Sequence, residues 1–118
     1  MKNLILVAVL LFFNLGCSQI KGKLITEVSQ SELDNVVLVD VRTPGEFNAG
    51  HLEKAINIDW LGDSFSAEFE KIEKNQTIYL YCKSGKRSAD ATKFLDSLGY
   101  KNVVNLEGGY IAWVEKNN

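Results

Sequence analysis

The chain has 118 residues, of which 46% are hydrophobic and 24% are charged, and its formal net charge at pH 7 is -2. This composition is that of one globular domain with a small core, and it excludes a second domain of ordinary size. The charge balance excludes the strongly basic field of nucleic-acid-binding proteins, so we expect no nucleic acid as a partner.

The first sixteen residues differ from the rest of the chain. Lys2 is their only charged residue, and an apolar run follows it over 4–13. A basic start, an apolar middle and a small residue at Gly16 are typical of a secretory signal. The run is well short of the about 20 residues that a membrane-spanning helix needs. We therefore predict a cleaved signal peptide over 1–16 and an exported protein.

Gly16 followed by Cys17 resembles the processing site of bacterial lipoproteins, in which the cysteine becomes the N-terminal residue and carries the lipid. The resemblance implies lipidation of Cys17 and a membrane-anchored protein that faces the periplasm. The polar residues that follow predict a tether over 17–23. Asn14 departs from the aliphatic residue usual in that family at its position. The alternative is a cleaved export signal and a soluble periplasmic protein.

Extended apolar runs predict the strands of the domain, which we expect over 24–118. The clearest runs, 36–41 and 77–82, are nearly continuous in apolar or β-favouring residues, which is typical of strands buried on both faces of a parallel sheet. Shorter candidates lie at 55–58 and 103–105, and 24–28 is a weaker one.

Helical patterns alternate with these strands. Ser29, followed by Glu32 three residues later, predicts a capping box that opens a short helix. Three further helical faces are formed by Phe65, Phe69 and Ile72, by Ala91, Phe94, Leu95 and Leu98 before Gly99, and by Tyr110, Trp113 and Val114. The alternation predicts an α/β fold with a small, mostly parallel central sheet flanked by helices, in which ligands bind at the carboxyl ends of the strands.

The segment with the strongest chemical signal begins at Cys82, where a predicted strand ends and a predicted helix begins. It reads CKSGKRS over residues 82–88. Amides of the turn and of the helix N-terminus favour an anion there, and a thiolate is the nucleophilic form of cysteine. Gly85 permits the positive φ that a tight loop needs. Positive charge comes from Lys83, Lys86 and Arg87. We therefore expect an ionised sulfur, open to solvent, within a ring of amides and cations.

Two other interpretations of this segment are weaker. Most single cysteines are buried core residues, but a core position needs neither three cations nor a glycine beside it. A Walker phosphate-binding loop needs two spaced glycines before Lys-Ser, and only Gly85 is present. A metal site is not expected either. If Cys17 carries a lipid, one histidine and one free cysteine remain, and these cannot build a metal site. We therefore expect neither a metal nor another cofactor.

The loop CKSGKRS resembles the active-site loop of rhodanese domains, which is Cys, usually a basic residue, Ser or Thr, Gly, any residue, Arg and Ser. Two other segments resemble signatures of the same family. One spans 39–58 and contains VDVR, EF, GHL and AINI, and the other is LEGGYIAW over 106–113. The three motifs occur in the family's order and cover nearly all of the predicted domain, which implies a rhodanese-like fold.

The resemblance implies a sulfurtransferase whose working group is a persulfide on Cys82. The sulfur would come from a small sulfur-containing anion such as thiosulfate, or from a protein donor, and pass to cyanide, a thiol or a protein acceptor. Arg87 would act with Cys82 in catalysis. The substrate would be bound by Lys83, Ser84, Gly85, Lys86 and Ser88.

Other matched residues are expected to have supporting roles. Asp40 and Arg42 would orient the loop or pair with Glu46, and contact with the substrate is the less favoured interpretation. His51, the only histidine, is expected to be a structural residue remote from the loop.

Two rival functions remain open at this point. One is a lipid-tethered module that binds or carries persulfide without catalysing its transfer. The other is a cysteine phosphatase or arsenate reductase, but those phosphatases have five residues between the cysteine and the arginine. Only four separate Cys82 from Arg87, and Tyr81 replaces the histidine that commonly precedes the phosphatase cysteine.

Overall fold

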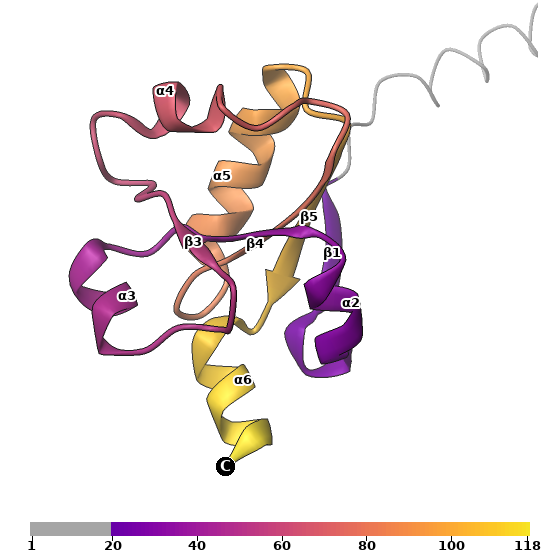
Figure 1. Ribbon diagram of the computed structural model, residues 1–118, viewed down its shortest axis with the longest axis vertical. Helices are drawn as coiled ribbons and strands as arrows, with labels where there is room; N and C mark the ends of the chain where they lie inside the picture. The colour runs from indigo at the N-terminus through magenta and orange to yellow at the C-terminus, as the bar shows by residue number, and fades with distance from the viewer. Residues whose placement is uncertain (1–19) are drawn as a thin grey trace, which may run out of the picture.

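A computed structural model describes residues 20–118, which form one sheet with helices on both faces (Figure 1). The predicted signal peptide and Cys17 lie outside the described residues. The strands are β1 (Lys21–Leu24), β2 (Val37–Asp40), β3 (Ile56–Asn57), β4 (Thr77–Tyr81) and β5 (Asn102–Glu107). The helices are the 3-10 helix η1 (Ile25–Glu27) and the α-helices α2 (Gln30–Asp34), α3 (Pro44–Ala49), α4 (Phe65–Phe69), α5 (Lys86–Ser97) and α6 (Gly109–Asn117).

The five strands lie in the order β1-β5-β4-β2-β3, and every neighbouring pair is parallel. The predicted α/β fold with a central parallel sheet is therefore confirmed. β4 occupies the middle of the sheet, so its carboxyl end is flanked by β5 and β2. Among residues 20–118, no helix has both the length and the apolar content needed to cross a bilayer.

The two faces of the sheet bury separate cores, which follow from the period-two alternation of side chains in a strand. Ile78 and Leu80 of β4 point into the core that α4 and α5 cover. Tyr79 and Tyr81 point into the opposite core, which residues of α2 and α6 complete. β4 is thus buried on both faces, as its continuous apolar run predicts.

The first strand lies earlier than the sequence predicts. We expected a strand over 24–28, but β1 ends at Leu24 and the 3-10 helix η1 follows it. All four residues of β1 are exposed, so no alternation of apolar side chains marks the strand. Its position is set by pairing with β5, in which Lys21 lies opposite Val104. Residues 21–23, expected in the tether, are therefore part of the sheet.

Helix capping also differs from the prediction. Ser29 caps α2 by accepting a hydrogen bond from the N–H of Glu32, but the Glu32 carboxylate binds Lys23 at 2.6 Å and the Tyr79 hydroxyl instead of closing the box. A complete capping box forms between Thr43 and Glu46 and opens α3. This helix is absent from the prediction, although its Thr-Pro-x-Glu start is a typical helix signal.

Candidate active site

Cys82 directly follows the central strand β4, and α5 begins four residues later at Lys86. The turn between them requires Gly85 at φ 115°, in the left-handed region that glycine adopts without strain. The predicted positive φ of Gly85 is therefore confirmed. The thiol is thus held between the end of a buried strand and the first turn of a twelve-residue helix.

The side chain of Cys82 is buried, with 1% of the residue exposed. It continues the alternation of Ile78 and Leu80, so it points into the core under α5, where it lies with Ala91. The prediction of a sulfur open to solvent is wrong for this structure. The physical reason is the strand period, which carries the inward direction one residue beyond the end of β4.

Neutral donors approach the sulfur inside this buried position. The backbone N–H of Gly85 lies 3.1 Å from Cys82 Sγ, and the hydroxyl of the fully buried Ser88 lies 3.4 Å from it. Burial raises the pKa of the Cys82 thiol, but hydrogen bonds from Ser88, Gly85 and Ser84 outweigh it and hold the pKa below its ordinary value. The site can therefore hold a thiolate away from water.

The last helix, α6, contacts the backbone of the active loop. The N–H groups of Tyr110 and Ile111, in the first turn of α6, donate to the carbonyl oxygens of Cys82 at 2.8 Å and Lys83 at 3.1 Å. A Cβ on Gly109 would lie 2.4 Å from the Lys83 oxygen, so only glycine fits there. The start of α6 therefore fixes the backbone of the loop, a contact that the sequence analysis does not predict.

The loop cations lie farther out than predicted. Lys83 is exposed, and the Lys86 side chain is 86% exposed, with its ammonium 3.7 Å from Asp90. The hydrogen bonds recorded to Cys82 Sγ come from an amide and a hydroxyl rather than from these cations. The ring around the sulfur is therefore mainly neutral, and the lysines belong to the rim.

Arg87, in the first turn of α5, forms a two-pronged ion pair with Glu46 of α3. Its two terminal nitrogens donate to the two carboxylate oxygens at 2.8 and 3.0 Å. The hydrogen bonds from Arg87, with smaller contributions from Thr43, lower the pKa of Glu46 to about 2 against the effect of burial. Arg87 is thus tied to the helix that faces the loop.

A family model described as the rhodanese-like domain matches residues 26–116. The chain belongs to the rhodanese-like family. It is 44% identical over 115 residues to rhodanese-like domain-containing protein 17 of Arabidopsis thaliana, with 84% of this chain and 74% of that protein covered. It is 36% identical over 83 residues to a sulfurtransferase of Allochromatium vinosum, with 70% and 76% covered.

The solved structures agree with this assignment. A rhodanese-related protein from Thermoplasma volcanium matches with a TM-score of 0.72 and 28% identity, over 81% of this chain and 92% of that one. This similarity confirms the predicted rhodanese-like fold.

Two of those motif residues, Asp40 and Arg42, pair with each other. The Arg42 Nε lies 3.0 Å from both carboxylate oxygens of Asp40, and the two side chains are 4% and 0% exposed. The predicted pairing with Glu46 is wrong, because Glu46 binds Arg87. Arg42 also donates to the Gly50 carbonyl at 2.6 Å and lies 4.3 Å from the ring centre of Tyr110. The pair therefore supports the start of α6.

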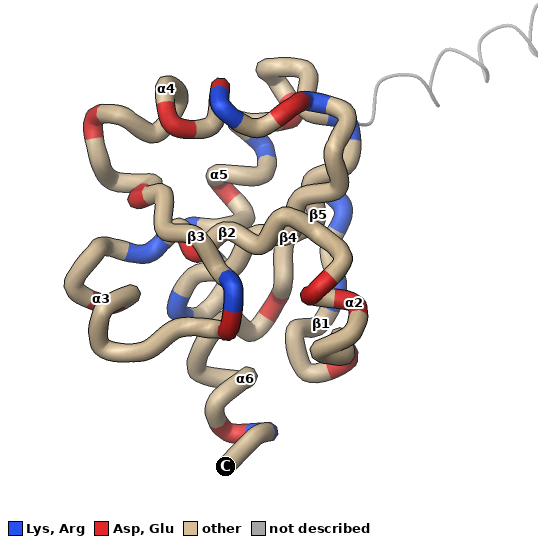
Figure 2. The backbone as a smooth tube through the Cα atoms, in the orientation of Figure 1, with Lys and Arg blue, Asp and Glu red and all other residues tan. Residues whose placement is uncertain are grey.

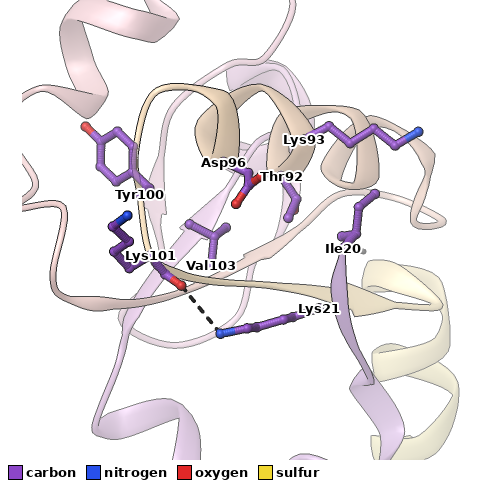
Figure 3. A pocket seen from close by; sticks show the side chains of 8 residues that line it. All are labelled: Ile20, Lys21, Thr92, Lys93, Asp96, Tyr100, Lys101 and Val103. Carbon is purple, nitrogen blue, oxygen red and sulfur yellow. Dashed lines mark hydrogen bonds between the residues drawn. The ribbon is translucent and has the colours of Figure 1, made fainter. Parts of the chain in front are cut away.

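Two other features of the rhodanese-like domain, His51 with its contacts to Phe47 and a pocket beside α5, include no residue of the loop 82–88. His51 is exposed, stacks on Phe47 and donates from Nδ1 to its carbonyl oxygen at 2.8 Å. A pocket of about 230 Å³ lies between α5 and the strands β1 and β5 (Figure 3). Its lining includes Asp96 and Val103 but no predicted site residue. Charges of both signs are spread over the described fold (Figure 2).

Proposed function

We propose that this rhodanese-like domain transfers a sulfane sulfur from a donor such as thiosulfate to cyanide or a thiol, with Cys82 as the carrier. The observation that carries the proposal is that the N–H of Gly85 and the hydroxyl of Ser88 donate hydrogen bonds to the buried sulfur of Cys82, at 3.1 and 3.4 Å, which favours the thiolate. The relative from Allochromatium vinosum is named a sulfurtransferase, which supports the same reaction class.

In the first step, the Cys82 thiolate attacks the outer sulfur of thiosulfate. A sulfur–sulfur bond forms to Cys82, the sulfur–sulfur bond of thiosulfate breaks, and sulfite leaves with the bonding electron pair. Cys82 becomes a persulfide anion, so the total charge is unchanged. The loop amides would stabilise both the thiolate and the terminal sulfur of the persulfide, as preorganised donors do for developing oxyanions.

In the second step, the acceptor attacks the terminal sulfur of the persulfide. Cyanide leaves as thiocyanate, or a thiolate leaves as a persulfide, and the electron pair of the broken sulfur–sulfur bond returns to Cys82. No external oxidant or reductant is needed, because the sulfane sulfur moves at constant oxidation level between two nucleophiles. The domain therefore returns to its starting state after each turnover.

The rim of the loop would receive an anionic donor. Lys83 and Lys86 are exposed there, and their charges would raise the local concentration of thiosulfate. Ser84 is exposed between them, while Cys82 is buried. We therefore propose that the loop from Lys83 to Gly85 moves to admit the donor, and that the sulfur is shielded from water again during transfer.

Mass spectrometry of the chain after incubation with thiosulfate tests this function. We expect Cys82 to gain the mass of one sulfur atom, cyanide to remove it with formation of thiocyanate, and Cys82→Ser to remain folded and gain nothing. Turnover of thiosulfate by Cys82→Ser would remove the mechanism. A persulfide that forms only from a protein donor would instead support a persulfide carrier, and hydrolysis of a phosphate ester would support the phosphatase alternative.

We also propose that the domain acts outside the cytoplasm, on a membrane anchor at Cys17. The support is the sequence of residues 1–17 alone. In bacterial cells, a labelled fatty acid should enter the chain, and Cys17→Ala should prevent it. An unlabelled chain recovered in the soluble periplasmic fraction would support the cleaved export signal instead.

A further inference from the structure

The carboxylate of Glu46 connects α3 to the start of α5 by forming a bidentate ion pair with the guanidinium of Arg87. The two hydrogen bonds, at 2.8 and 3.0 Å, engage both terminal nitrogens of Arg87. The side chains are 25% and 30% exposed, so water screens the pair only in part. Two parallel hydrogen bonds fix the plane of a guanidinium as well as its position.

Glu46 is itself fixed before it meets Arg87. The N–H and the hydroxyl of Thr43 lie 3.1 and 3.0 Å from Glu46 Oε1, and the N–H of Glu46 donates back to the Thr43 hydroxyl. This capping box anchors the carboxylate on the first turn of α3. With a pKa of about 2, Glu46 stays ionised throughout the neutral pH range.

The ion pair with Glu46 leaves some N–H donors of Arg87 available to a ligand. The ion pair uses one N–H on each terminal nitrogen, and the remaining N–H donors of the guanidinium form no hydrogen bond with residues 20–118. Arg87 also precedes Ser88, whose hydroxyl lies 3.4 Å from Cys82 Sγ. The free donors therefore belong to the residue that directly precedes Ser88, one of the donors to the sulfur, in the first turn of α5.

We infer that Glu46 is a positioning residue that turns the free donors of Arg87 toward the anion that reacts with Cys82. This inference rests on the proposed function, since it names what orients the anion in that reaction. Two plainer roles make different predictions. If Glu46 only offsets charge, its removal should strengthen the attraction of Cys82 for anions; if it only joins α3 to α5, its removal should change stability alone.

The test compares two alkylating agents at Cys82 of the full chain. Iodoacetate is an anion and iodoacetamide is its neutral counterpart, and peptide mass spectrometry measures Cys82 apart from Cys17. The rate ratio of iodoacetate to iodoacetamide reports how well the site orients an anion at the sulfur. We expect the ratio to fall about threefold or more in Glu46→Gln, because a neutral amide offers a single acceptor oxygen to the guanidinium.

Three further variants make this result specific. Glu53→Gln removes the same charge from an exposed position and should leave the ratio unchanged. Glu46→Asp keeps the charge but shortens the side chain by one methylene, and its ratio should also fall. Arg87→Ala should lower the ratio, and adding Glu46→Gln to it should lower it no further, because Glu46 acts through Arg87.

A ratio that rises or stays unchanged in Glu46→Gln would overturn the inference, and so would a wild-type ratio in Glu46→Asp. Additive losses in the double variant would do the same. This readout does not need sulfur transfer. A chain that takes no sulfur from any donor but shows the expected ratios would disprove the proposed function and leave the role of Glu46 standing. In an active chain, Glu46→Gln should raise the KM for thiosulfate about tenfold while circular dichroism shows an unchanged fold.

Discussion

The backbone N–H of Tyr110 donates a 2.8 Å hydrogen bond to the carbonyl oxygen of Cys82. This contact joins the last helix to the residue that we propose as the sulfur carrier. Because the carbonyl oxygens of Cys82 and Lys83 are engaged by α6, the loop amides that follow are free to point at the sulfur, as the N–H of Gly85 does at 3.1 Å. The chemistry of the loop therefore depends on a helix that begins 27 residues after Cys82, at position 109 against position 82.

Gly109→Ala should damage the active loop. An added Cβ would lie 2.4 Å from the Lys83 oxygen, and Gly109 has φ 66°, which disfavours alanine. We expect sulfur transfer to fall about tenfold or more and the free energy of unfolding to fall by about 1–3 kcal/mol. Assays with thiosulfate and cyanide and urea unfolding would measure the two effects.

The matched control for that change is Gly45→Ala. Gly45 lies in α3, and an added Cβ would meet nothing within 4 Å. Its effect on stability should stay within about 1 kcal/mol, because alanine is the better helix former. Equal activity in Gly109→Ala and Gly45→Ala would show that the contact with α6 does not set the loop geometry.

Ser88→Ala should destabilise the thiolate form of Cys82 relative to the thiol. It removes the hydroxyl that lies 3.4 Å from Cys82 Sγ, so the pKa of Cys82 should rise and sulfur transfer at neutral pH should fall about tenfold or more. Ser97→Ala makes the same change in the last turn of the same helix, where the hydroxyl donates only to the Phe94 carbonyl, and should leave transfer unchanged. A Ser88→Ala chain with the wild-type Cys82 pKa would contradict this role.

Asp40→Asn should destabilise the domain rather than alter its chemistry directly. It leaves the buried Arg42 guanidinium without its anionic partner, and breaking such a pair costs about 3–5 kcal/mol. Urea unfolding would measure this cost. A loss below about 1 kcal/mol would mean that water reaches Arg42 when Asp40 no longer neutralises it.

The sequence predicts the centre of this fold better than its edge. β4 and α5 follow from a continuous apolar run and a helical face on either side of Gly85, because local patterns and burial agree there. β1 is misplaced because its residues are all exposed, and only pairing with β5 defines it. α3 is missed although the Thr43–Glu46 capping box leaves a readable signal.

The candidate site also has local features that the sequence predicts and tertiary contacts that it does not. The identity of the loop residues and the φ of Gly85 are readable from the sequence, because they are local. The alternation of Ile78 and Leu80 also predicts the burial of Cys82, whereas the positive charges that follow it favour an exposed sulfur. The contacts of Glu46 with Arg87 and of Gly109 with Lys83 are tertiary contacts between distant segments, and no local pattern encodes them.

The most direct test is the pKa of the Cys82 thiol, measured from the rate of its alkylation by iodoacetamide. The rate is followed between about pH 4 and about pH 10, a range that covers most cysteine pKa values found in proteins. Only the thiolate reacts, so the rate rises with pH through the pKa. We predict a midpoint below that of a free cysteine in the same assay, which is about 8.5. A midpoint at or above that of the free thiol would contradict it, because burial would then outweigh the hydrogen bonds from Ser88 and Gly85.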